Sequence, residues 1–268
     1  MNKSIIDLKN QVGDKYLHGI CNVLSHIFSL EDVASLYYDI SNPNCYINKI
    51  ELYYFKGNII GFNSWRVFEI NINNELIHVS RAASFLLPEF RGKGISTLFF
   101  SKQALIYKIK HIFSKTPHYF FFLACGISSF YLIHKFNDNK YVYPNVTSNT
   151  QNENHFSVAA KIANQFNYSI TCVDPLKVKD QWAVPKRTSI NPNNNNRSDS
   201  CGNILSFYVN NTMKNDETLI VLVVVSWRQL LSVCKKIAHA FSMKYSSMII
   251  LKIKSIKHVA QNKEFGLI

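Results

Sequence analysis

A short loop with two glycines stands where the sequence is expected to pass from a strand to a helix. The loop reads PEFRGKG over residues 88–94. Gly92 and Gly94 have no side chain, so the backbone can approach a ligand closely. The helix that follows presents free N–H groups and the positive end of its dipole, and such a terminus binds phosphate groups. Arg91 and Lys93 add positive charge at the rim.

The spacing of these glycines differs from two common phosphate-binding patterns. The loop lacks the GxxxxGK[ST] spacing of a P-loop and the third glycine of a dinucleotide-binding fingerprint. We therefore expect a pyrophosphate to be held in another way. The alternative interpretation is a plain glycine turn between a strand and a helix.

The elements around this loop follow from hydrophobic periodicity. Before the loop, β-rich runs separated by the turns Lys56-Gly57-Asn58 and Asn73-Asn74 predict an antiparallel meander with strands over residues 50–55, 59–72 and 76–87. After the loop, helical spacing predicts an amphipathic helix over 95–113, with one apolar stripe made of Leu98, Leu105, Ile106, Ile109, Ile112 and Phe113. The apolar run HYFFFLA (118–124) is typical of a strand buried on both faces.

The two ends of the chain are expected to add further elements. Residues 1–40 look helical, with a second short helix over 32–40. Downstream, the pattern predicts helices over 128–136, 156–166 and 227–241, and strands over 141–143, 204–209, 219–225 and 248–256. The segment NPNNNNRSDS (191–200) reads as a low-complexity loop.

The loop and the order of elements around it resemble the GNAT superfamily of N-acetyltransferases over roughly residues 15 to 145. The family signature [QR]-x-x-G-x-[GA] is similar to Arg91-x-x-Gly94-x-Ser96, which follows Leu87-Pro88. The resemblance implies an α+β fold with a mixed, mostly antiparallel central sheet flanked by helices. Residues 1–150 would form the acyl-CoA-binding core, and 151–268 an α/β extension that either completes the sheet or begins a second domain.

The resemblance also implies a general acid. The family often shows Y-x-x-x-G-F after its fifth strand, and the chain has Tyr131-Leu-Ile-His-Lys135-Phe136, with lysine in place of glycine. Tyr131 would then lie near the coenzyme A sulfur and protonate the departing thiolate. The alternative is a core tyrosine on an amphipathic helix. Ala124 stands where the family frequently has asparagine.

A general base is implied by a second correspondence. Several relatives carry a glutamate on the fourth strand, thirteen residues before the first residue of the motif, and this position is His78 here. Histidine titrates near neutrality, which suits the task. The alternatives are a structural histidine, Glu75 or Glu51 in its place, or no dedicated side chain.

The resemblance names acetyl-CoA as the co-substrate and an amine, on a small molecule or a protein, as the acceptor. Pantetheine would pair with the backbone of Phe85, Leu86 and Leu87. The pyrophosphate would lie on the N–H groups of Arg91, Gly92, Lys93, Gly94, Ile95 and Ser96. The amine would attack the thioester directly, without a covalent enzyme intermediate. The alternative function is a catalytically degenerate GNAT-fold protein that acts on a partner through its basic C-terminal part.

Composition sets wider bounds on the function. The 268 residues carry 30 Lys and Arg against 17 Asp and Glu, a net charge of +13, and are 47% hydrophobic. This charge fits an anionic ligand, a nucleic acid, an anionic lipid surface or an ordinary lysine-rich surface, although no nucleic-acid-binding motif is present. The six cysteines form no close pair, so we expect no metal site. No apolar run is long enough for a membrane span, and we expect a cytoplasmic protein.

Overall fold

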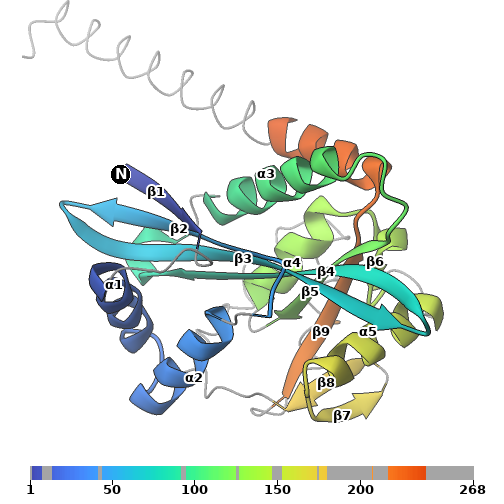
Figure 1. Cartoon of the computed structure of the whole chain (residues 1–268), viewed down its shortest axis with the longest axis horizontal. Coiled ribbons are helices and arrows are strands. Elements are labelled where there is room, and N and C mark those ends of the chain that lie inside the picture. Colours follow the sequence, from blue (N-terminus) through green and yellow to red (C-terminus); the bar gives the residue numbers. More distant parts are fainter. Residues whose placement is uncertain are drawn as a thin grey trace, which may run out of the picture.

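The computed structural model describes residues 2–7, 14–41, 44–91, 95–124, 127–146, 153–173, 175–179, 207 and 217–239. Within these residues the strands form one nine-stranded sheet, in the order β1-β2-β3-β4-β5-β9-β8-β7 with β6 paired to β9 (Figure 1). The strands are β1 (Asn2–Asp7), β2 (Ile47–Phe55), β3 (Asn58–Ile72), β4 (Glu75–Leu86), β5 (His118–Ala124), β6 (Val142–Tyr143), β7 (Ile170–Val173), β8 (Leu176–Lys179) and β9 (Glu217–Val224). In this part of the chain no helix has both the length and the apolar character that crossing a membrane requires.

Helices cover both faces of the sheet. They are α1 (Asp14–Ser25), α2 (Leu30–Ile40), α3 (Ile95–Lys110), α4 (Ile127–Phe136), α5 (Glu153–Gln165) and a helix through 227–239, with short 3-10 turns at Pro88–Phe90 and Asn139–Tyr141. Because side chains alternate along β3, Phe62 and Phe68 point to the face covered by α1, α2 and α5. Trp65 and Val67 point to the opposite face, where they share a core with α3, α4 and the helix 227–239.

The predicted meander is confirmed, because β2, β3 and β4 pair antiparallel in succession. The turn at Asn73 and Asn74, both with positive φ, sets the register in which Glu69 lies opposite His78. The predicted β5, α4, β6, α5 and β9 are also present, with bounds shifted by a few residues. The helical prediction for the first residues is wrong, because Asn2–Asp7 form an edge strand that pairs antiparallel with β2.

The apolar stripe predicted for α3 is not the side of the helix that packs on the sheet. The buried side chains of α3 are Phe99, Gln103, Ala104 and Tyr107. Leu98, Ile109 and Ile112, which belong to the predicted stripe, are exposed instead. Both sides of this helix are rich in apolar residues, so periodicity alone does not tell which side meets the sheet.

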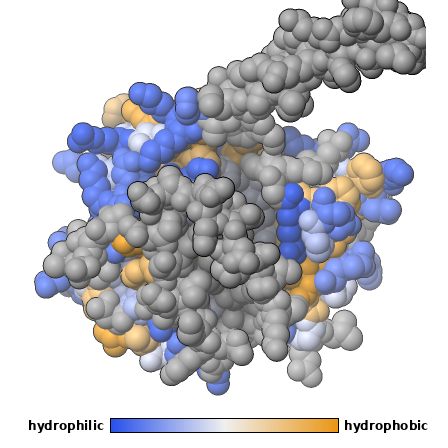
Figure 2. Space-filling view, turned by 180° about the vertical axis from the view of Figure 1, so that it is seen from behind, coloured by the Kyte–Doolittle hydropathy of each residue, from blue (hydrophilic) through white to orange (hydrophobic). Residues whose placement is uncertain are grey.

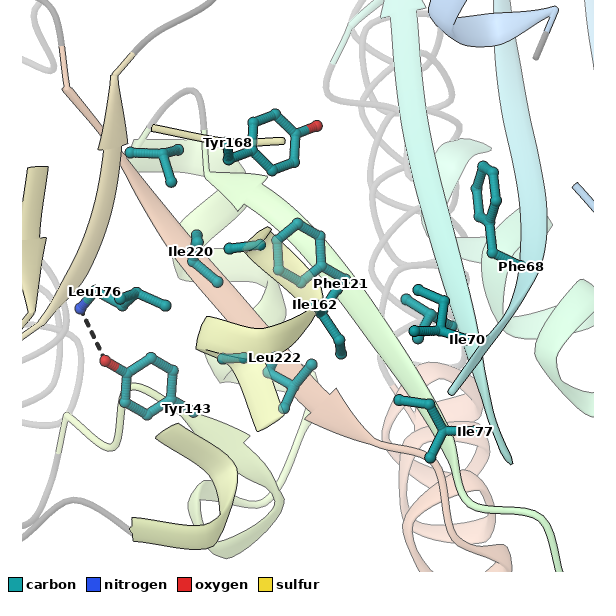
Figure 3. Packing of buried hydrophobic residues seen from close by; sticks show 14 of the residues in the cluster. Phe68, Ile70, Ile77, Phe121, Tyr143, Ile162, Tyr168, Leu176, Ile220 and Leu222 are labelled. Atoms are coloured by element: carbon teal, nitrogen blue, oxygen red, sulfur yellow. Dashed lines mark hydrogen bonds between the residues drawn. The ribbon is translucent and has the colours of Figure 1, made fainter. Parts of the chain in front are cut away.

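Strand β9 brings the later part of the chain into the middle of the sheet. It pairs antiparallel with both β5 and β8. Figure 3 shows Ile220 and Leu222 of β9 in one core with Phe121 of β5 and Ile162 of α5. The same view shows the Leu176 N–H donating to the Tyr143 hydroxyl, 2.8 Å away.

Three predicted segments lie wholly or largely outside the described residues. They are the asparagine-rich loop 191–200, the strand 248–256 and the strand 204–209. Of the last, only Phe207 is described, and it is helical.

Candidate functional site

Strands β4 and β5 run side by side only at their beginnings. They pair in parallel from His78 opposite His118 to Arg81 opposite Phe121. β4 then continues to Leu86 without pairing with the rest of β5, and β5 pairs with β9 on its other side from Tyr119 to Ala124. Residues 82–86, which we call the open end of β4, therefore have no partner strand on the β5 side within the described structure. An unpaired strand edge of this kind can bind an extended chain through main-chain hydrogen bonds.

The hydrogen-bond pattern shows which main-chain groups face the open side. The N–H of Leu87 donates to the carbonyl of Ile60 on β3, at 3.0 Å. Because successive residues of a strand turn their main-chain groups in opposite directions, Phe85 also faces β3, and Leu86 faces away from it. Of the three residues predicted to pair with pantetheine, Leu86 is thus the one whose main chain is turned towards the open side.

Arg91 ties the loop after β4 back to that strand. Its Nε donates to the carbonyl of Leu86 at 2.8 Å, and its own N–H donates to the carbonyl of Pro88 at 3.2 Å. The predicted pyrophosphate-binding residues 92–94 lie outside the described residues. What the structure describes is the approach to the loop, which is held close to the open end of β4.

The first turn of α3 is fixed against the same strand. The Oγ atoms of Ser96 and Ser84 lie 2.6 Å apart, and Ile95 packs against the small core that contains Leu86. The first turn of α3 contains no acidic residue. The positive end of its dipole is therefore not neutralised from within the helix, which is the electrostatic condition for binding an anion there.

Tyr131 lies on α4, the helix that follows β5. It is half-buried and packs against the core on the α3 face. Lys135, which takes the place of the family's glycine, has its Nζ 5.6 Å from the centre of the Tyr131 ring. The neighbouring Phe130 is fully buried, so α4 is anchored beside this tyrosine.

His78 lies under the last turns of α3, at the paired beginning of β4. Its Nδ1 is 2.7 Å from the hydroxyl of Tyr107, and its Nε2 is 3.4 Å from a carboxylate oxygen of Glu69. The carboxylate of Glu69 can only accept, so Nε2 carries the proton and Nδ1 accepts from the Tyr107 hydroxyl. Both ring nitrogens of His78 therefore have partners.

The surroundings of His78 favour its neutral form. Burial lowers its pKa, and the nearby His111 and Lys108 lower it further, while Glu69 acts in the opposite direction. Burial also raises the pKa of Tyr107, so its hydroxyl keeps its proton. At neutral pH His78 is thus a neutral ring with its proton on Nε2, held in this tautomer by its two neighbours.

Several members of this cluster were missed in the sequence. Tyr46 stacks on His78 at 6.4 Å between ring centres, and His111 stacks on Tyr107 at 4.3 Å. The fully buried His118 has its Nε2 2.7 Å from Ser80 Oγ. The available signal was the spacing of Tyr107 and His111, because residues four apart share one face of a helix.

The two alternative bases lie elsewhere. Glu51 is buried on β2, where it accepts a hydrogen bond from the Tyr53 hydroxyl and forms an ion pair with Lys3 at 3.2 Å. Glu75 is exposed at the start of β4. It lines a hollow of about 330 Å³ between the β3–β4 turn and α5.

A second charged cluster lies on the opposite face of the sheet, at the point where β4 leaves β5. Arg66 and Arg81 stand opposite each other on β3 and β4, and Asp39 of α2 pairs with both, at 3.1 and 2.8 Å. Burial raises the pKa of Asp39, but the two guanidinium groups outweigh it and lower the pKa overall. Arg81 also donates to the hydroxyl of Tyr168. This cluster was not recognised in the sequence, because its members are far apart along the chain.

Comparisons with known proteins were made for the whole chain. No protein-family model and no curated protein matches it. Several solved structures described as N-acetyltransferases resemble it, at low TM-scores and low identity. An aminoglycoside antibiotic 6'-N-acetyltransferase from Acinetobacter haemolyticus is 14% identical over 50% of this chain and 88% of its own, with a TM-score of 0.35. An N-acetyltransferase from Staphylococcus aureus is 9% identical over 84% and 99%, with a TM-score of 0.37.

A third structure is described as a probable N-acyltransferase from Enterococcus faecalis. It is 12% identical over 53% of this chain, with a TM-score of 0.34, and the match spans only 34% of that longer protein. The architecture itself is a large, open, mostly antiparallel sheet with helices on both faces and one parallel pair of strands that part. This is the mixed, mostly antiparallel sheet flanked by helices that was expected from the sequence.

Proposed function

We propose that the protein is an N-acyltransferase that moves the acetyl group of acetyl-CoA to an amine. One observation carries the proposal: β4 parts from β5 after Arg81, and the loop 88–94 and the start of α3 follow directly at the open end of β4. An unpaired strand edge and an unneutralised helix N-terminus thus stand next to each other. Together they match a ligand that has an amide-containing arm attached to a pyrophosphate.

Each part of the ligand has a partner in this arrangement. The pantetheine arm pairs with the main chain of the open end of β4, chiefly at Leu86. The carbonyl of Leu86 already accepts a hydrogen bond from Arg91 Nε. The pantetheine arm therefore either replaces this hydrogen bond or donates a second one to the same oxygen. The pyrophosphate lies on the N–H groups of Arg91 through Ser96, as the motif implies. The charge of Arg91 and Lys93 adds electrostatic attraction.

The reaction is a direct transfer. The amine nitrogen attacks the thioester carbonyl carbon, a tetrahedral intermediate forms, and the carbon–sulfur bond breaks. Tyr131 donates its phenolic proton to the departing thiolate as the general acid, and the positive charge of the nearby Lys135 stabilises the phenolate left behind.

His78 serves as the base in this proposal. It is uncharged at neutral pH, which is the state a base requires. Because the Tyr107 hydroxyl already occupies its Nδ1, the proton from the acceptor amine reaches His78 through that hydroxyl. Glu69 then stabilises the imidazolium that forms.

The second candidate function is acyl-CoA binding without turnover. It is favoured by the same contacts of His78, since both ring nitrogens have partners and the side chain is buried beneath α3. Such a protein would bind acetyl-CoA and show no transfer to any amine. The two candidates share the ligand site and differ only in chemistry.

Calorimetric titration with acetyl-CoA tests the shared site. The Arg91→Glu, Gly94→Glu double variant is expected to lose saturable binding, because it places negative charge where the pyrophosphate lies. The Lys56→Glu variant alters an exposed lysine on the β2–β3 turn and is expected to bind like the wild type. A folded wild type that does not bind acetyl-CoA would exclude both candidates. Release of free coenzyme A with a panel of amines separates them.

A further inference from the structure

Four large apolar side chains are exposed on α3 and just past its end. Leu98 is 45% exposed, and Ile109 and Ile112 are each 53% exposed. Phe113, just past the helix end, is 96% exposed. The helix has a separate buried side that meets the sheet. We call these four exposed residues the outer stripe.

Such a stripe is unusual on a protein surface. Seen from behind, the described surface is mostly hydrophilic, with small hydrophobic groups scattered over it (Figure 2). Single exposed apolar residues are ordinary, but several in a row along one helix mark a surface that meets something apolar. Leu98 and Ile109 are about 16 Å apart along α3, and Ile112 and Phe113 follow just past its end. The outer stripe is therefore a candidate docking surface.

The part of the sequence that carries the outer stripe has charges of one sign. Residues 90–137 contain no Asp or Glu and carry seven Lys and Arg, at 91, 93, 102, 108, 110, 115 and 135. Lys102, Lys110 and Lys115 are exposed on or just after α3. The helix 227–239, which shares the same core on this face, also contains no acidic residue. The nearest described acidic side chains on this side are Glu69, 3.4 Å from His78, and Asp138, which is already paired with Lys236 at 2.8 Å. Apolar side chains flanked by lysines on the same helix therefore fit an anionic partner.

Charge also decides between the possible partners of the outer stripe. A second copy of this chain would bring the lysines of one α3 against those of the other, which opposes association. The segment 240–263 of the same chain has no acid and five lysines, so it meets the same repulsion. An anionic bilayer offers both partners that this surface lacks, acidic headgroups for the lysines and an apolar layer for the outer stripe.

We propose that the outer stripe of α3 docks the protein on an anionic lipid bilayer. Phe113, Ile109 and Ile112 enter the boundary between headgroups and acyl chains, and the flanking lysines contact the anionic headgroups while their stems cover apolar surface. The helix lies in the plane of the membrane, with its buried side still packed on the sheet. This surface is distinct from the open end of β4, and the inference does not depend on the proposed chemistry.

Sedimentation with vesicles tests the inference on the full chain. Vesicles of three parts phosphatidylcholine to one part phosphatidylserine are compared with phosphatidylcholine alone. The wild type is expected to bind the anionic vesicles and not the neutral vesicles. Its binding to the anionic vesicles is expected to weaken as the salt concentration is raised. Equal binding to both, or binding to neither, overturns the inference.

Two matched pairs of variants locate the surface. Ile109→Ser, Phe113→Ser is expected to weaken binding at least about tenfold, because two apolar side chains no longer leave water. Leu76→Ser, Val173→Ser replaces exposed apolar residues elsewhere and is expected to bind like the wild type. Circular dichroism confirms that each variant is folded.

The second pair changes charge. Lys102→Gln, Lys110→Gln is expected to weaken binding about tenfold or more, since each lysine near the surface contributes a factor of about five. Its control is Lys56→Gln, Lys179→Gln.

Unchanged binding by the Ile109→Ser, Phe113→Ser or the Lys102→Gln, Lys110→Gln variant overturns the inference. Two other results would assign the outer stripe to a different partner and would also overturn the inference. One is a wild-type dimer in analytical ultracentrifugation that Ile109→Ser, Phe113→Ser abolishes. The other is salt-sensitive binding to polyglutamate without binding to vesicles, which indicates an acidic protein partner.

Discussion

The carboxylate of Asp39, at the end of α2, lies 2.8 Å from the guanidinium of Arg81, the last residue at which β4 pairs with β5. The same carboxylate pairs with Arg66 on β3, which is fully buried. One acidic residue thus holds a helix and two strands together at the point where the sheet opens. The position of the open end of β4 depends on this cluster.

Replacing Asp39 is therefore expected to be costly. Asp39→Asn leaves two buried guanidinium groups without a counter-charge, and breaking such a pair from one side costs about 3–5 kcal/mol in the free energy of unfolding. Urea unfolding followed by tryptophan fluorescence measures the change. Glu89→Gln, at an exposed position in the turn after β4, is the control and should cost little. A loss for Asp39→Asn as small as that of the control would contradict the structural role.

Gly61 on β3 leaves room for the open end of β4. A Cβ atom there would stand 2.6 Å from the carbonyl oxygen of Phe85 and 2.9 Å from Cα of Leu86. Gly61→Ala must therefore move β4, and we expect it to lower the free energy of unfolding by about 1–3 kcal/mol, as overpacking does. It should also weaken acetyl-CoA binding in calorimetry. The control is Asn58→Ala at the exposed start of β3, and equal behaviour of both variants would refute the close approach.

Tyr131→Phe tests the general acid. If Tyr131 protonates the leaving thiolate, kcat for transfer falls about a hundredfold or more, with little change in acetyl-CoA affinity. Tyr141→Phe is a matched control, because Tyr141 also has a lysine over its ring, Lys140 at 4.9 Å. Steady-state release of coenzyme A measures both. A Tyr131→Phe enzyme with the wild-type kcat would remove the acid role, and an affinity loss alone would indicate a packing role.

Buried histidines make stability depend on pH. Burial lowers the pKa of His134 from 6.5 to about 4. Between these two values the unfolded chain binds a proton that the folded chain does not, so stability falls as the pH decreases from 7. His134 alone accounts for about 2 kcal/mol between pH 7 and pH 5.

The measurement is the free energy of urea unfolding at pH 7 and at pH 5. His134→Gln is expected to flatten this dependence, and His239→Gln, at an exposed histidine, is expected to leave it unchanged. The pKa values of His78 and His118 are also lowered, so the stability of both variants is still expected to depend partly on pH. An unchanged pH dependence in His134→Gln would show that His134 titrates normally in the folded chain.

Much of the fold could be predicted because its signals are local. The turns at Lys56-Gly57-Asn58 and Asn73-Asn74 place the meander, and the apolar run 118–124 marks a strand with neighbours on both sides. The loop 88–94 and the helix after it follow from glycine, proline and hydrophobic spacing. These features depend on residues within one turn of each other, which propensity and periodicity describe well.

Other features were decided by contacts between distant residues. Asn2–Asp7 form a strand because their main chain pairs with the edge of β2. The local sequence contains no pattern that predicts this pairing. The helix α3 has two apolar sides, and only packing against the sheet selected the side that contains Phe99 and Tyr107. The outer stripe was left exposed by that choice.

The site shows the same division. The sequence by itself determined the glycine loop, the helix start and the candidate residues Tyr131 and His78. Only the tertiary structure placed β9 beside β5 and ended the pairing of β4 with β5 at Arg81, and only the hairpin register brought Glu69 opposite His78. Strand pairing and charge neutralisation join residues that are far apart in the sequence. Their free energy depends on which of these residues are buried next to each other, and local sequence patterns do not contain this information.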